Sequence, residues 1–282
     1  GREEKMQFTK MEGIGNDYIY INCFKEKVEH PAELAVQMAD RHFGVGGDGI
    51  ILIEPSKVAD AFMHMFNADG SEGAMCGNGI RCTAKYLYDH GMVEKERKSM
   101  KIETLSGVKD ISFQAEEGKL VRATVDMGEV KLSSTLPEKI EVAGMDLSFV
   151  GIDVGNPHAV YFLEDNAALG PAISALDFSR LGEAFEKHPR FPNRVNSEFI
   201  EIISRKEIRF RVYERGSGET LACGTGATAS VVAGCLLKKL DASVLVHLRG
   251  GDLEIRYDEK TKHAFMSGGA GEVFVGEWDL LL

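Results

Sequence analysis

Two copies of a Cys-Gly-x-Gly motif hold the residues best suited to chemistry in this sequence. They begin at Cys76 and Cys223, and each opens an apolar run that we expect to be helical, over 76–90 and 223–239. The second helix should carry Lys238 and Lys239 in its last turn. A cysteine at a helix N-terminus faces unpaired backbone N–H groups and the positive end of the helix dipole, which favours thiolate over thiol. Because the whole context is repeated, we predict one functional thiol in each half of the chain.

Other uses of cysteine fit the spacing less well. Cys76 and Cys82 are six residues apart and Cys223 and Cys235 are twelve apart, with no histidine at ligand spacing beside them, so we expect no metal site. A dithiol redox motif would need Cys-x-x-Cys, which is absent. We interpret Cys23, Cys82 and Cys235 as small buried hydrophobic residues.

A pair of thiols suggests a specific reaction. Two thiols on opposite faces of one carbon could remove a proton from one side and return it on the other, which is racemisation or epimerisation by two bases. Helix N-terminal N–H groups would stabilise the negative charge that develops on a substrate carboxylate. Pyridoxal phosphate would need a Schiff-base lysine and a phosphate cup, for which we find no candidate, so we expect no cofactor. A thiol redox or binding protein remains the alternative of a different class.

The composition restricts the class of protein and its partners. The 282 residues are 44% hydrophobic and 27% charged, with a formal net charge of −11 that argues against nucleic acid and anionic membranes as partners. Five cysteines without framework spacing favour a reducing compartment, and no apolar run approaches the roughly 20 residues of a membrane span. The polar N-terminus has no signal-peptide pattern. We therefore expect a cytoplasmic protein with a small-molecule substrate.

The order of expected elements is the same in both halves of the chain. In each, a strand, a polar glycine-rich turn, the cysteine motif, a buried helix and further strands follow one another. This predicts an α+β fold of two pseudo-symmetric domains, each a mixed or antiparallel sheet wrapped around a central helix. The first domain should span 6–122, completed by a C-terminal strand at about 269–282, and the second 123–268. We also expect helices over 31–42 and 172–188.

One glycine-rich segment invites a different interpretation. Residues 44–49 match G-x-G-x-x-G, but a helix precedes them and a strand follows. A dinucleotide-binding turn needs the reverse order, so we predict a helix-to-strand turn without a nucleotide.

Several short motifs together resemble those of the diaminopimelate epimerases, from Met6 nearly to the C-terminus. The segments that carry the resemblance are Gly15-Asn16-Asp17, Asn67-Ala68-Asp69-Gly70-Ser71-Glu72, Met75-Cys76-Gly77-Asn78-Gly79-Ile80-Arg81-Cys82, Gly155-Asn156-Pro157-His158, Arg194-Val195-Asn196, Glu214-Arg215-Gly216 and Cys223-Gly224-Thr225-Gly226. The resemblance implies a pyridoxal-independent isomerase that interconverts LL- and meso-diaminopimelate in lysine and peptidoglycan precursor synthesis. It also implies the epimerase fold and a homodimer.

The resemblance assigns roles residue by residue. It implies that Cys76 and Cys223 are the acid/base residues, with His158 and Glu214 tuning the thiols. The remaining assigned residues would bind substrate. Gly77, Asn78, Gly224 and Thr225 would contact the reacting end, and Asn16, Asn67, Asn156, Asn196, Glu214 and Arg215 would hold the rest of the molecule. Amide oxygens and a carboxylate suit an ammonium group, and arginine suits a carboxylate.

Two departures and one competing family qualify this assignment. Some relatives carry glutamine where this chain has Gly49, and some have tyrosine at a dimer contact where it has Phe274. The competing family is that of the proline and hydroxyproline racemases, which share the fold and the paired cysteines. They usually show histidine after the first Cys-Gly and Ser-Pro before the second cysteine. Here those positions are Asn78 and Leu221-Ala222, which favours the epimerase.

Overall fold

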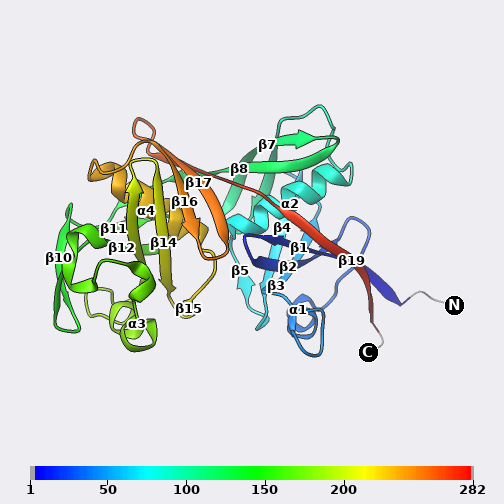
Figure 1. Cartoon of the computed structure of the whole chain (residues 1–282). Helices are drawn as coiled ribbons and strands as arrows, with labels where there is room; N and C mark the ends of the chain where they lie inside the picture. The colour runs from blue at the N-terminus through cyan, green and yellow to red at the C-terminus, as the bar shows by residue number, and fades with distance from the viewer. Residues whose placement is uncertain (1–3, 281–282) are drawn as a thin grey trace. The chain divides into compact units, whose positions relative to one another are not determined.

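The structure is a computed structural model that describes residues 4–280 and shows a mixed α+β fold (Figure 1). The chain forms two compact units. Unit 1 contains the residues up to Val125 together with those from Gly268 onwards, and unit 2 is Asp126–Ser267. The boundary falls within strand β8, Lys119–Glu129, in the same strand as the boundary expected after residue 122.

Unit 1 is built on one mixed sheet. Its strands follow in the spatial order β19–β1–β2–β3–β4–β6–β7–β8, with β5 paired to β4. The pairs β2/β3 and β4/β6 are parallel, and the others are antiparallel. Besides β8, the strands are β1 (Lys5–Gly13), β2 (Asn16–Asn22), β3 (Gly49–Glu54), β4 (Ala61–Asn67), β5 (Glu72–Gly73), β6 (Ser99–Thr104), β7 (Gly107–Glu116) and β19 (Gly271–Asp279).

Unit 2 repeats this arrangement. The order β11–β12–β13–β14–β16–β17–β18 has β9 and β10 paired to β11 and β15 paired to β14. The parallel pairs are β12/β13 and β14/β16, at the positions equivalent to those of unit 1. The strands are β9 (Lys131–Leu132), β10 (Glu138–Val142), β11 (Met145–Asp153), β12 (Pro157–Phe162), β13 (Asn196–Ser204), β14 (Glu207–Glu214), β15 (Gly218–Glu219), β16 (Ser243–Leu248), β17 (Gly251–Asp258) and β18 (His263–Gly268).

The strand register makes individual positions of the two units equivalent. Tyr18 pairs with Gly49 across the first parallel pair of unit 1, and His158 pairs with Asn196 across that of unit 2. Two residues further along β3 and β13, Ile51 is therefore equivalent to Glu198. The same correspondence relates Asn16 to Asn156.

A central helix packs against the sheet of each unit. Helix α2, Gly77–Asp89, contacts β1, β2 and β6, and α4, Gly224–Leu236, contacts β11, β12, β13 and β17. Helix α2 is buried over most of its length, and its apolar contacts include Ile80, Ala84 and Leu87. Helix α4 is buried almost all round, because it is made largely of alanine, glycine, serine and valine, and these small side chains allow close approach of the sheet.

In each unit, the segment of chain that connects the first two parallel strands contains a second helix. Helix α1, Pro31–Ala39, places Leu34 and Met38 in one core cluster with Ile19 and Ile50. Helix α3, Phe178–Glu186, places Phe185 in the corresponding aromatic cluster of unit 2. Residues on the opposite strand face, such as Tyr20, meet the central helix instead: its hydroxyl donates to the Gly79 carbonyl oxygen at 3.0 Å. Both faces of β2 are thus covered, which explains its nearly continuous apolar run.

Three helices are shorter than the sequence pattern predicts. Helix α1 ends at Ala39 rather than 42, and the segment 172–188 contains the 3₁₀ turn η3, Ile173–Ala175, followed by α3. Two further 3₁₀ turns precede it, η1 (Leu163–Asp165) and η2 (Ala167–Leu169). Helix α4 ends at Leu236, so Lys238 and Lys239 lie outside its last turn. Lys238 has a positive φ of 61°, which turns the chain away from the helix axis.

The close packing of α4 predicts an unusual response to a glycine substitution. Alanine normally stabilises a helix interior by about 1 kcal/mol relative to glycine. A Cβ at Gly234, however, would lie 2.3 Å from Leu240 Cδ1 and 2.6 Å from its Cγ. We expect Gly234→Ala to lower the free energy of unfolding by about 1–3 kcal/mol in denaturant titrations. Combining it with Leu240→Ala should remove most of that cost, and simple additivity of the two substitutions would contradict the proposed clash.

Candidate active site

Each cysteine of the repeated motif is the N-cap of a central helix. Cys76 has an extended backbone, and its Sγ accepts a hydrogen bond from the Gly79 N–H at 3.4 Å. Cys223 has the same geometry, and its Sγ accepts from the Gly226 N–H at 3.3 Å. The sulfur therefore takes the place of the usual Ser, Thr or Asp cap oxygen. This fixes each thiol at the point where the helix N–H groups converge.

The surroundings of Cys76 come from β2 and from the turn before β3. The Cys76 thiol donates to Asn16 Oδ1 at 2.9 Å, and Asn16 Nδ2 donates to Asp48 Oδ2 at 2.6 Å. Asp48 also accepts from the Asp17 N–H at 3.1 Å, and Arg41 lies 3.3 Å from it. Because a carboxylate can only accept, Asp48 fixes the orientation of the Asn16 amide and turns its oxygen toward the sulfur.

A fully buried arginine lies beside the first cysteine. Arg81 is 0% exposed, and its guanidinium donates to Asn78 Oδ1 at 2.9 Å and to the carbonyl oxygens of Gly77 and Gly269. Burial raises the pKa of the Cys76 thiol, and the positive charge of Arg81 is one of the effects that oppose this rise. Asn78, which the sequence predicted to bind substrate, is only 2% exposed, and its side chain points into the protein.

The surroundings of Cys223 differ in charge. His158 Nδ1 lies 2.6 Å from Glu198 Oε1, and both side chains are fully buried. His158 Nε2 lies 2.9 Å from Asn156 Oδ1, and Asn156 Nδ2 donates to Thr225 Oγ1 at 3.2 Å. Thr225 Oγ1 in turn lies 3.6 Å from Cys223 Sγ. The structure thus links five side chains of unit 2 in one chain of contacts that ends at the sulfur.

The electrostatic expectation for the two thiols is wrong for this structure. Burial raises the pKa of the Cys76 thiol, against the N–H groups of Gly79 and Asn78 and the Tyr18 hydroxyl, which lower it. Burial also raises the pKa of the Cys223 thiol well above its ordinary value, and the Glu214 carboxylate adds to the effect. The helix N-termini do stabilise the thiolates, but the loss of solvation outweighs them.

The other predicted site residues are distributed over the two units. Asn67 donates to Ser71 Oγ at 3.1 Å at the end of β4. Asn196 donates to the Pro157 carbonyl oxygen at 3.0 Å and accepts from the Arg215 N–H at 2.8 Å, so it positions the turn after β14. The Thr220 hydroxyl donates to Glu214. Unit 1 therefore holds Asn16, Asn67, Cys76, Gly77 and Asn78, and unit 2 holds Asn156, His158, Asn196, Glu214, Arg215, Cys223, Gly224 and Thr225.

Gly49 is required by the close approach of β3 and β4. A Cβ at this position would lie 2.1 Å from the Phe66 carbonyl oxygen. Any side chain at this position would need the strands to move apart. No side-chain contact at this position is available to the chain as it is folded.

Sequence reasoning did not identify Glu198, Arg81, Tyr18 or Asp48 as parts of the site. The sequence around two of them contains a feature that could have identified them. Glu198 is an acid inside the buried run of β13, and Arg81 follows Ile80 on a helix whose first two turns are buried. A charged residue at a buried position needs a partner or a function, and both these residues lie beside a cysteine of the motif.

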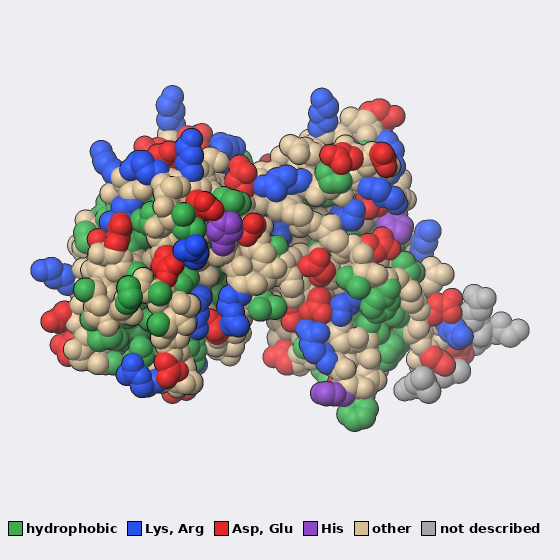
Figure 2. All heavy atoms as spheres, in the orientation of Figure 1, with side chains coloured by type: hydrophobic (Ala, Val, Ile, Leu, Met, Phe, Trp, Pro, Cys, Tyr) green, Lys and Arg blue, Asp and Glu red, His purple; other side chains and the backbone are tan. Residues whose placement is uncertain are grey.

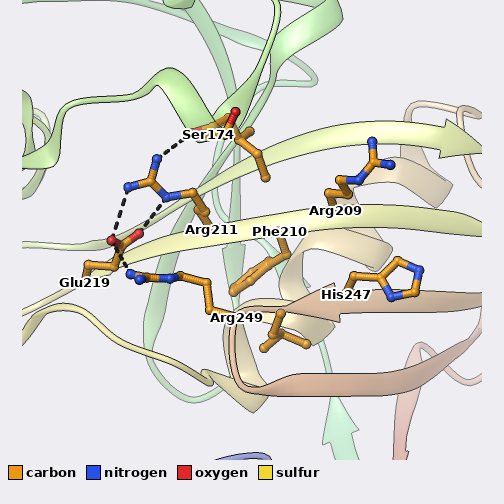
Figure 3. A pocket seen from close by; sticks show the side chains of 9 residues that line it. Ser174, Arg209, Phe210, Arg211, Glu219, His247 and Arg249 are labelled. Carbon is orange, nitrogen blue, oxygen red and sulfur yellow. Dashed lines mark hydrogen bonds and ion pairs between the residues drawn. The ribbon is translucent and has the colours of Figure 1, made fainter.

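A surface pocket of about 490 Å³ in unit 2 lies apart from the thiols (Figure 3). Its lining includes Arg211 and Arg249, and each has a nitrogen 2.6 Å from a Glu219 carboxylate oxygen. Figure 3 marks both pairs with dashed lines. His247, also in the lining, lies between Glu207 and Asp252, and these carboxylates raise its pKa. Because these lining charges are already paired, the pocket offers no strong anion site.

The described part of the chain shows neither a metal-binding cluster nor a membrane-spanning helix. Within residues 4–280, no group of three or more His, Cys, Asp or Glu side chains has the geometry to hold a metal ion. The helices in that part of the chain are too short or too polar to cross a membrane.

Comparison with known proteins assigns the family. A family model described as diaminopimelate epimerase matches residues 8–133 and 150–273. The chain belongs to the diaminopimelate epimerase family. Relatives with that name include proteins from Agathobacter rectalis, 46% identical over 98% of this chain and 100% of the relative, and Desulfovibrio desulfuricans, 47% identical over 97% and 98%. A relative from Methanococcus maripaludis is 44% identical over 98% of this chain and all of its own length.

Solved structures of more distant proteins share the fold of this family. A probable proline racemase from Agrobacterium radiobacter, crystallised with carbonate, has a TM-score of 0.73 at 16% identity and covers 96% of this chain and 92% of its own. A hydroxyproline epimerase from Agrobacterium vitis has a TM-score of 0.70 at 17% identity, covering 99% and 93%. At this level of identity the comparison supports the fold alone.

The position of Arg81 leads to a testable prediction about Cys76. We expect Arg81→Met to raise the pH midpoint for alkylation of Cys76, because the positive charge that favours its thiolate is lost. It should also destabilise unit 1, since three acceptors lose their donor, at about 1–3 kcal/mol for each one left buried and unpaired. Peptide mass mapping of alkylated cysteines across a pH series gives the midpoint. Arg81→Lys, which keeps the charge, should shift it less, and Cys223 serves as the internal control.

Proposed function

We propose that the protein is a diaminopimelate epimerase that interconverts LL- and meso-diaminopimelate without a cofactor. The observation that carries the proposal is membership of the family, with 43–48% identity to relatives of that name over nearly the full chain. Two cysteines that cap the central helices of equivalent units are consistent with it. The reaction would serve lysine and peptidoglycan precursor synthesis.

The proposed mechanism uses Cys76 and Cys223 as two bases. One thiolate would remove the α-hydrogen of the substrate, and the other thiol would deliver a proton to the opposite face of the same carbon. Because burial disfavours both thiolates, binding of a substrate ammonium group would have to offset that cost. The backbone N–H groups at the helix N-termini would stabilise the charge that develops on the α-carboxylate.

The remaining site residues would bind and orient the substrate. Gly77, Asn78, Gly224 and Thr225 would contact the reacting end, with Asn78 acting through its backbone because Arg81 engages its side chain. His158 and Glu214 would tune Cys223, which lies in the same unit. The residues proposed to hold the rest of the substrate are Asn16, Asn67, Asn156, Asn196, Glu214 and Arg215.

The cellular setting follows from the same proposal. All five cysteines, each within the described part of the chain, are free. A two-base thiol mechanism needs reduced cysteines, which the cytoplasm maintains. We therefore propose a cytoplasmic enzyme.

Hydrogen exchange with solvent tests the reaction and the mechanism together. Protein dialysed against chelator and free of pyridoxal phosphate should incorporate deuterium from heavy water at the α-carbon of diaminopimelate while interconverting its isomers. Cys76→Ala and Cys223→Ala should each lower epimerisation by at least about a thousandfold, since one of two bases is lost, and each can retain exchange from one face.

Controls separate this function from the alternatives. Proline and hydroxyproline should remain unlabelled, and labelling of either in preference to diaminopimelate would assign the racemase activity instead. A thiol redox protein would label none of them. Near-normal turnover by either cysteine variant, with its fold verified by circular dichroism, would rule out the two-base mechanism.

We also propose a homodimer that uses the exposed side chains of strand β19. Val273, Phe274 and Val275 are consecutive residues there, 55%, 45% and 59% exposed. Figure 2 shows hydrophobic side chains gathered on unit 1 over the region where β1 and β19 run in Figure 1. The Phe274 ring packs edge-on against Phe8 at 6.1 Å, which holds it in place without covering it. An exposed apolar strand of this kind is typical of a protein interface.

A charge substitution on β19 tests the dimer. Phe274→Glu should shift the protein from dimer to monomer in sedimentation experiments, because a buried unpaired carboxylate disfavours association. Phe43→Glu is the matched control, since Phe43 is a 91% exposed aromatic residue elsewhere on unit 1. A wild-type monomer at micromolar concentration, or equal dissociation by both variants, would contradict the proposed interface.

A further inference from the structure

The charged pair beside Cys223 is incompletely satisfied. Glu198 Oε1 lies 2.6 Å from His158 Nδ1, but its second oxygen, Oε2, has no hydrogen-bond partner among residues 4–280. A buried carboxylate with a bare oxygen is strongly disfavoured in its charged form. Consistently, burial raises the pKa of the Glu198 carboxyl group. Burial therefore favours a protonation state in which His158 and Glu198 together carry no net charge.

The contacts of Asn156 indicate where the hydrogens of the pair lie. Its Nδ2 donates to Thr225 Oγ1, and its Oδ1 faces His158 Nε2 at 2.9 Å. An amide oxygen only accepts, so His158 Nε2 must carry a hydrogen. The 2.6 Å contact between Nδ1 and Glu198 Oε1 needs a hydrogen as well. Together, His158 and Glu198 then hold one proton more than a neutral imidazole and a bare carboxylate would.

With this proton in place, the hydrogen bonds all run in one direction. His158 Nε2 donates to Asn156, and Asn156 donates to Thr225. The Thr225 oxygen has then accepted a hydrogen bond, and its own hydrogen is free to point toward Cys223 Sγ, 3.6 Å away. If the pair lost its proton, Nδ1 would keep the remaining hydrogen for Glu198, and Nε2 would become an acceptor. The side-chain amide of Asn156 would then have to flip, and it would no longer donate a hydrogen bond to Thr225.

Unit 1 shows that packing alone does not require an acid at this position. Ile51, the equivalent of Glu198, lies beneath the helix N-terminus, 3.0 Å from where a Cβ on Gly79 would be. Glu198 Oε1 lies 2.7 Å from the corresponding point on Gly226. The direction of the hydrogen bonds also differs, because in unit 1 the Cys76 thiol donates outward to Asn16 and Asn16 donates to Asp48. The acid in unit 2 therefore has a role that isoleucine cannot fill.

We propose that Glu198 is a positioning residue for Cys223: it shares one buried proton with His158, and this proton turns the donors of Asn156 and Thr225 toward the sulfur. The inference rests on the proposed function only in taking Cys223 as the acid/base group. Other titratable groups face the same space: Glu214 from β14, which accepts from Thr220, and the hydroxyl of Tyr161 from β12. A Glu198 carboxylate without the shared proton would instead repel the Cys223 thiolate, as Glu214 does.

The shared proton can be observed directly. Nitrogen-15 spectra of the histidine-labelled full chain near neutral pH should show that His158 Nε2 carries a hydrogen and that Nδ1 is shared with a hydrogen-bond partner. A His158→Asn variant identifies the signal among the eight histidines. An unprotonated Nε2 would overturn the proposal, whether or not the protein epimerises diaminopimelate. The measurement therefore fails or succeeds independently of the proposed function.

Two substitutions at Glu198 test its effect on the thiol. Glu198→Gln can donate an amide hydrogen to Nδ1 in place of the shared proton, so the pH midpoint for alkylation of Cys223 should stay within about 0.3 unit of wild type. Glu198→Met leaves His158 Nδ1 without a partner, so the ring is no longer held with Nε2 toward Asn156, and the midpoint should rise by about one unit. If Glu198 were a bare carboxylate, both variants would lower the midpoint, because a negative charge beside the sulfur would be lost.

The controls distinguish a structural effect from a positioning effect. Alkylation of Cys76 in the same samples should be unchanged, because it lies in the other unit. Glu201→Gln, three residues further along β13, removes an acid outside the chain of contacts and should leave the Cys223 midpoint unchanged. A fall of the midpoint in Glu198→Gln, or an unchanged one in folded Glu198→Met, would overturn the proposal.

Discussion

The cap formed by a cysteine sulfur at the start of each central helix is the interaction on which both units depend. It brings a weakly polar group to the place where helix N–H groups need an acceptor, 3.4 Å from the Gly79 nitrogen in unit 1 and 3.3 Å from that of Gly226 in unit 2. The glycines that follow are required by the close approach of the sheet, since a Cβ at Gly226 would meet both Glu198 and the sulfur. The sheet, the helix and the thiol therefore constrain one another.

Burial of the thiols opposes the effect of the helix dipole. A sulfur at a helix N-terminus on the surface would be readily ionised, but here desolvation raises both thiol pKa values. Each thiol therefore depends on its neighbours to stabilise a thiolate. The groups around each sulfur, and not the helix N-terminus alone, must therefore stabilise the thiolate.

The two units solve this problem with different side chains on the same framework. Beside Cys76, unit 1 has the buried cation Arg81 and an outward chain through Asn16 to Asp48. Beside Cys223, unit 2 has the His158–Glu198 pair at positions that unit 1 fills with Tyr18 and Ile51. Equivalent strands and helices thus carry non-equivalent electrostatics. The two-base mechanism proposed above has no need of identical halves, because each thiol would meet a different face of the substrate.

The sequence by itself determined the repeated helix starts, the helix-to-strand turn at 44–49 and the alternation of strands around an apolar helix, because caps, glycines and hydrophobic periodicity act over a few residues. It overestimated the lengths of α1 and α4, whose ends depend on local turns and tertiary contacts rather than on apolar runs. Only the tertiary structure decided the surroundings of the thiols. Arg81 bonds to Gly269, and His158 meets Glu198, through contacts between residues distant in sequence that strand order creates. The direction of the thiol pKa shifts also came from burial, which is a property of the packed unit and cannot be inferred from the motif that surrounds each cysteine.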